Sequence, residues 1–138
     1  MSFQEKSAWI MGAVLAVVYG WYFVSIAGEI TGDVAEISYQ GMMLAAVVAV
    51  VVLAAAAHAV VAIAGPKDAD HSDDRDKEIT RYGENIGRFA LVTGALVALA
   101  LAMVEADHFW IANAILAGLV LAELTSVGTR IILYRRGM

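Results

Sequence analysis

Hydrophobic residues occupy this chain in long uninterrupted runs. Stretches free of Asp, Glu, Lys and Arg cover residues 8–27, 41–65, 89–104 and 109–122, and the last apolar stretch continues past Glu123 to Tyr134 with Arg130 inside it. A membrane-spanning helix needs about 20 apolar residues at a rise of about 1.5 Å each. The third run is short alone, but a helix that begins near Asp74 lengthens it. Because no period-2 alternation is present, the pattern predicts helices over about 8–27, 41–65, 74–104 and 109–134.

The predicted fold is therefore all-α, an integral membrane four-helix bundle that uses residues 1–138 as a single transmembrane domain. Composition agrees, because 61% of the residues are hydrophobic and the mean hydropathy is +0.73, well above the range of soluble domains. The lipid bilayer is thus the expected surrounding. Ser25-Ile26-Ala27 resembles a signal-peptide cleavage site, but the run before it is long and rich in aromatic residues, which favours a retained helix.

Charges between the helices predict the orientation. The connections over residues 28–40 and 105–108 are acidic and contain no Lys or Arg. The cations all fall elsewhere: Lys6, Lys67, Arg75, Lys77, Arg81, Arg88, Arg130, Arg135 and Arg136. By the positive-inside rule both termini and the charged loop 66–84 are expected to be cytoplasmic.

Several functional classes lose support from what the chain lacks. It has no cysteine, so it offers no thiolate nucleophile and no Cys-based metal site. A net charge of −5 without clustered cations argues against nucleic acid as a partner. No nucleophile motif or phosphate loop is present, so an enzyme is less expected, although an intramembrane site built from Glu123, His58 and Asn113 stays open. No cofactor is expected.

Glu123 is the first candidate site residue, because a carboxylate inside an apolar span is costly and usually faces protein or water. His58 should lie at a similar depth, and Arg88 and Thr93 near the inner end of the third helix complete a predicted intramembrane polar cluster. The cluster could pin the helices together. Alternatively, Glu123 and His58 could relay protons, or Glu123 could snorkel toward the interface.

The inner loop is the second candidate. Its carboxylates and histidine include Asp70, His71, Asp73, Asp74 and Asp76, and oxygen-rich clusters of this kind bind Ca²⁺ or Mg²⁺. However, no register supplies both the glycine and the glutamate of an EF-hand, so a metal remains undetermined. The alternative is helix initiation, with Ser72 or Asp73 as the cap and carboxylates in the first turn.

The segment after this loop is amphipathic. Apolar residues recur at helical spacing (Ile79, Tyr82, Ile86 and Phe89) opposite charged ones (Glu78, Arg81 and Glu84), which indicates a stripe that lies on the membrane or docks a partner. Small residues also recur every fourth position, as Gly83 and Gly87 and as Gly12, Ala16 and Gly20. Close helix contacts are expected there, within the chain or between subunits.

Three segments carry a resemblance: Asp73-Asp74-Arg75-Asp76-Lys77-Glu78-Ile79, Phe109-Trp110-Ile111-Ala112-Asn113 and Tyr134-Arg135-Arg136-Gly137. Over its second half the chain resembles small bacterial inner-membrane proteins of unknown function, whose loop motif reads Asp-Glu-Arg-Asp. Asp74 departs from that motif by replacing the glutamate. Because such proteins often neighbour helix-turn-helix regulators, the resemblance implies a regulatory partner at the cytoplasmic loop.

Two hypotheses follow. The first is a non-enzymatic membrane module that self-associates as a homo-oligomer and binds a cytosolic protein through its charged loop. The second is a small proton-linked transporter or channel that uses Glu123 with His58 and Arg88.

Overall fold

The structure is a computed structural model, which describes residues 2–69 and 73–137. Its long helices are α1 (Phe3–Glu29), α2 (Gln40–Ala64), α4 (Asp74–Met103) and α5 (His108–Arg135). A 3-10 turn, η1 (Val34–Glu36), lies between α1 and α2, and a short helix, α3 (Pro66–Ala69), follows α2. All four long helices are long and apolar enough to span a membrane, so the predicted membrane four-helix bundle is confirmed.

Local sequence signals explain where these helices begin and end. Ser2 caps α1 by accepting a hydrogen bond from the backbone N–H of Glu5, which starts the helix earlier than predicted. Asp107 caps α5 in the same way through the N–H of Phe109. Gly65 ends α2, and Pro66 begins α3 because its missing N–H is not needed in a first helical turn.

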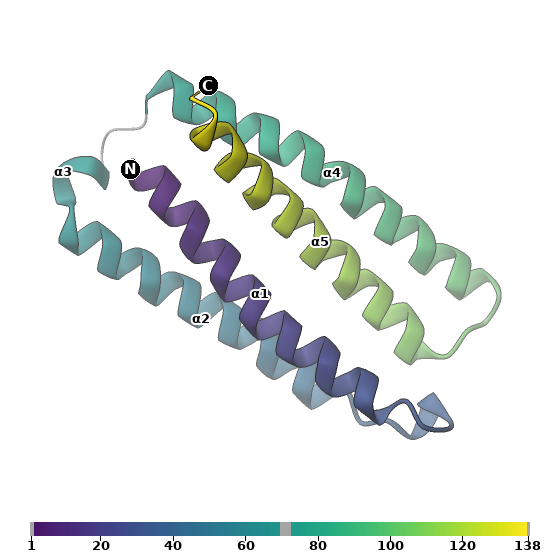
Figure 1. Cartoon of the computed structure of the whole chain (residues 1–138). Coiled ribbons are helices and arrows are strands. Elements are labelled where there is room, and N and C mark those ends of the chain that lie inside the picture. Colours follow the sequence, from purple (N-terminus) through teal and green to yellow (C-terminus); the bar gives the residue numbers. More distant parts are fainter. Residues whose placement is uncertain (1, 70–72, 138) are drawn as a thin grey trace.

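The four long helices pack in the order α2, α1, α5, α4, as they appear side by side in Figure 1. The extensive contacts are those of α1 with α2, of α1 with α5 and of α5 with α4. The buried core lies among α1, α2 and α5 and is built around Tyr22, Leu116 and Val120. The arrangement is therefore an open row, in which α2 and α4 occupy the two edges.

Helix α4 is held against α5 by glycines rather than by large apolar side chains. A Cβ atom on Gly87 would lie 2.5 Å from the carbonyl oxygen of Ala122, and one on Gly94 would lie 2.5 Å from the Cα of Gly118. Only residues without a side chain allow two backbones to approach this closely. The small-residue spacing of Gly83 and Gly87 thus marks a contact within the chain.

The equivalent pattern on α1 is only partly used. Gly12 lies close to Val127 of α5, since a Cβ there would meet Cγ1 of Val127 at 3.1 Å, whereas Gly20 has nothing within 4 Å. Ala16 is exposed.

Both described ends of the chain lie at the same end of the helix row, together with α3 and the start of α4 (Figure 1). Every Lys and Arg belongs to this half of the molecule. The opposite end holds η1 and the turn between α4 and α5, where Glu29, Asp33, Glu36, Glu105 and Asp107 gather without a cation. The row is thus electrostatically polarised along its helices, and the cytoplasmic assignment of the cationic end stays a prediction from the positive-inside rule.

Candidate functional site

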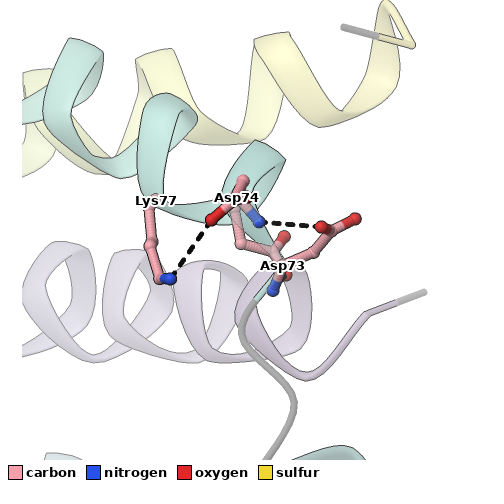
Figure 2. A network of polar contacts seen from close by, with 4 residues as sticks. Asp73, Asp74 and Lys77 are labelled. Carbon is pink, nitrogen blue, oxygen red and sulfur yellow. Dashed lines mark hydrogen bonds and ion pairs between the residues drawn. The ribbon is translucent and has the colours of Figure 1, made fainter.

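The acidic residues at the start of α4 form a helix cap. Asp73 is the N-cap, and its side chain accepts a 2.7 Å hydrogen bond from the N–H of Asp74. The Asp73 side chain also accepts from the backbone N–H of Asp76, and the N–H of Asp73 donates to Asp76 Oδ2 at 3.4 Å, so that these two bonds form a capping box. Lys77 pairs with Asp74 at 3.3 Å on the exposed side (Figure 2). Helix initiation, the second interpretation of this loop, accounts for all three carboxylates.

Asp76 has an additional role in the packing of α4. It is one of the few buried polar residues among those described, with 8% of its surface exposed. Its Oδ1 accepts a 2.8 Å hydrogen bond from the hydroxyl of Tyr134, 58 residues away near the end of α5. This clasp, defined by Asp76 and Tyr134, ties the first turn of α4 to the last turn of α5.

Metal binding in the loop has no support among the residues that the structure describes, where no group of three His, Asp or Glu side chains is arranged to hold an ion. Two of the candidate ligands, Asp70 and His71, lie outside the described residues.

The predicted intramembrane cluster is divided by the fold. His58 lies beside α1, where its Nε2 is 2.6 Å from Ser7 Oγ. Thr93 is exposed and donates its hydroxyl hydrogen to the carbonyl oxygen of Phe89 on its own helix, at 2.9 Å. Glu123 and Arg88 come together, because both line one open hollow between α4 and α5. His58 and Thr93 are therefore placed apart from Glu123.

This charged hollow has a volume of about 220 Å³ and contains two acidic and two basic side chains: Glu84, Arg88, Glu123 and Arg130. Its remaining lining includes Leu91 and the buried Ser126. Since Gly87 touches Ala122 and Gly83 touches Ser126, the antiparallel register puts Arg88 and Glu123 at nearly the same depth. Glu84 lies about one turn closer to the cationic end than Arg88, and Arg130 lies about two turns closer than Glu123. The side chain of Arg130 nevertheless reaches this level, since its Cγ would lie 2.8 Å from a Cβ atom on Gly83.

The charges of the hollow are incompletely paired within the described chain. No ion pair or hydrogen bond joins its carboxylates to its guanidinium groups, and Arg130 Nε is buried without a partner. Glu123 and Arg88 are both exposed on the surface of the single chain. Exposed charges at this depth of an apolar span are unfavourable unless protein, water or a polar headgroup meets them.

Glu84 and Ser126 were absent from the predicted cluster. The sequence contained one signal for the first: Glu84 precedes Arg88 by four residues and so shares its helical face. Ser126 has no such signal, because its place in the hollow depends on the contact with Gly83 and Gly87.

A second polar surface lies on the side of α4 that faces away from α5. It is lined by the exposed residues Asp74, Lys77, Glu78, Arg81, Tyr82 and Asn85. The predicted amphipathic stripe is only partly buried here: Ile79 is 1% exposed, whereas Tyr82 is 52% and Phe89 is 76% exposed. Gly83 and Gly87 take the place of Tyr82 and Phe89 against α5, since only they allow the helices to approach.

The three segments that carry the resemblance all make structural contacts. Asp76 of the first meets Tyr134 of the third, and in the second Asn113 accepts a 2.7 Å hydrogen bond from the fully buried Tyr22. Comparisons with family models, curated proteins and solved structures found no match to this chain. The resemblance to small bacterial inner-membrane proteins therefore stays a prediction.

Proposed function

We propose that the chain is a non-enzymatic module of a bacterial inner membrane that binds a cytosolic protein partner through the first turns of α4. The observation that carries this proposal is the exposed polar face at the start of α4, lined by Lys77, Glu78, Arg81, Tyr82 and Asn85. The opposite face of the same turns is buried against α5. A surface that is already ordered before binding loses little conformational entropy when a partner docks.

The chemistry of this face favours a protein partner. Its charges are mixed in sign, so it presents both donors and acceptors, and Tyr82 adds an exposed aromatic ring of the kind enriched at protein interfaces.

The experiment places a photo-crosslinking amino acid at Arg81 and, as a matched control at the same end of the row, at Lys67. We expect Arg81 to trap a defined soluble protein and Lys67 not to do so. A Lys77→Glu, Glu78→Lys double reversal should lower the trapped fraction about tenfold by opposing the partner's charges. Trapping that is equal at both sites, or unchanged by the reversal, would contradict the proposal.

A second candidate function is favoured by the charged hollow. Glu123 with Arg88 beside it forms a titratable group inside an apolar span, as a small proton-linked transporter or channel requires. His58 forms a hydrogen bond with Ser7 and does not line the hollow, so in a proton path it would act separately from Glu123 and Arg88.

The test of this alternative is proton flux into proteoliposomes across a pH gradient. Glu123→Gln keeps the size of the side chain but removes its titration, and should abolish flux if the hollow carries protons. Glu36→Gln, on the exposed acidic turn, is the control and should leave flux unchanged. Flux that survives in Glu123→Gln would eliminate this residue from any transport mechanism.

A further inference from the structure

The open row leaves the charged hollow on a surface that faces out of the single chain. Glu123 also lines a neighbouring apolar groove formed by α1, α2 and α5, so the charged hollow and this groove meet at Glu123, between the two edges of the row. Leu119, one turn away on the same face of α5, lines that groove as well and is 46% exposed. The face thus combines apolar surface with a carboxylate and a guanidinium that lack partners.

Lipid tails would cover the apolar part of this face well, but they would leave Arg88 and Glu123 unsatisfied. A protein occupant that meets both charges must bring an acidic and a basic group to the same depth in the membrane.

A second copy of this chain meets that requirement by symmetry. Copies that insert with one orientation form a symmetric pair whose two-fold axis lies along the membrane normal, so each group meets groups at its own depth. Arg88 and Glu123 share one depth but lie on neighbouring helices. When two copies face one another, α4 of each lies opposite α5 of the other, and Arg88 of one copy is brought opposite Glu123 of the second.

We propose that the chain forms a parallel homodimer through this face, in which Arg88 and Glu123 make two symmetric ion pairs between the subunits. Ion pairs between helices in a membrane are held more firmly than exposed surface pairs, because no bulk water competes for the charges. The hollow is incomplete without the second copy, since each subunit contributes one half of each pair.

The absence of native cysteine allows a direct test in membranes. Leu119→Cys and Leu121→Cys form a matched pair: the side chains are 46% and 56% exposed and lie at similar depth, but they point about 160° apart around α5. Under mild oxidation we expect a disulfide-linked dimer from Leu119→Cys and little from Leu121→Cys. Equal crosslinking at both positions, or none at Leu119, would overturn the dimer.

Charge exchange tests the ion pairs themselves. In the Leu119→Cys background, Glu123→Arg or Arg88→Glu alone should reduce the crosslinked fraction about tenfold, because both symmetric pairs are lost together. The combination of Glu123→Arg with Arg88→Glu should restore crosslinking, and this rescue also shows that the combined variant inserts and folds. Light scattering in detergent checks the same for each single variant. Failure of the combined variant to recover, while light scattering in detergent shows intact monomers, would contradict the pairing.

Discussion

Gly94→Ala is expected to destabilise the protein by about 3 kcal/mol, because the new methyl group has no space against α5. Its Cβ would stand 2.5 Å from the Cα of Gly118, which is backbone and cannot rotate away. The two helices must then move apart along their whole contact. Since α4 packs extensively on α5 alone among the long helices, the loss falls on the one interface that holds it.

The measurement is denaturant unfolding of the detergent-solubilised protein, followed by far-UV circular dichroism. Gly128→Ala is the matched control, because Gly128 is also a helical glycine but has nothing within 4 Å. It should be neutral or stabilising by up to about 1 kcal/mol, since alanine restricts the unfolded chain more than glycine does. Equal effects of the two variants would show that close approach of the backbones does not hold α4 in place.

The helices themselves were predictable from the sequence, because each depends on a single long apolar run and on caps only a few residues away. Asp73 was one of the two caps foreseen, beside Ser72, for that reason: its partners are the nearby N–H groups of Asp74 and Asp76. The extra length at the start of α1 and the short α3 were not foreseen, since single polar residues and a proline decide them.

The composition of the charged hollow was only partly predictable, and depth and direction explain why. Counting residues along a helix gives the depth of Glu123 or His58 in the membrane, but it does not tell which helix stands beside each side chain. His58 belongs to the same bundle as Glu123, but its side chain forms a hydrogen bond with Ser7 on α1. Arg88 joins Glu123 because the glycine contacts set the register of α4 on α5.

The same distinction applies to the clasp. Asp76 and Tyr134 each belong to a segment that carries the resemblance, but 58 residues separate them and no local pattern links them. Asp76 was predicted as a first-turn carboxylate or a loop ligand. The structure adds a buried tertiary contact, which uses the one carboxylate of that turn that points toward α5 rather than toward solvent.

Tyr134→Phe should lower the free energy of unfolding by about 2 kcal/mol, because it removes one hydroxyl and leaves a buried carboxyl oxygen of Asp76 without its donor. Shape is conserved, so packing contributes little to the change. Tyr82→Phe is the control on α4, the helix that packs against α5. Tyr82 is 52% exposed, so removing its hydroxyl leaves no buried acceptor without a donor. The two variants are compared by the same denaturant titration.

The position along α4 at which stability is lost in Tyr134→Phe distinguishes a local effect of the clasp from a weakening of the whole helix. The clasp holds the first turn of α4, so hydrogen exchange should accelerate over the first turns of that helix and remain slow at Gly94, where the glycine contact is untouched. Partner docking through Arg81 should weaken in parallel, since the polar face would lose its fixed position before binding. Uniform acceleration along α4 would instead mean that the two helices separate as one unit, and that the clasp and the glycine contact are not independent.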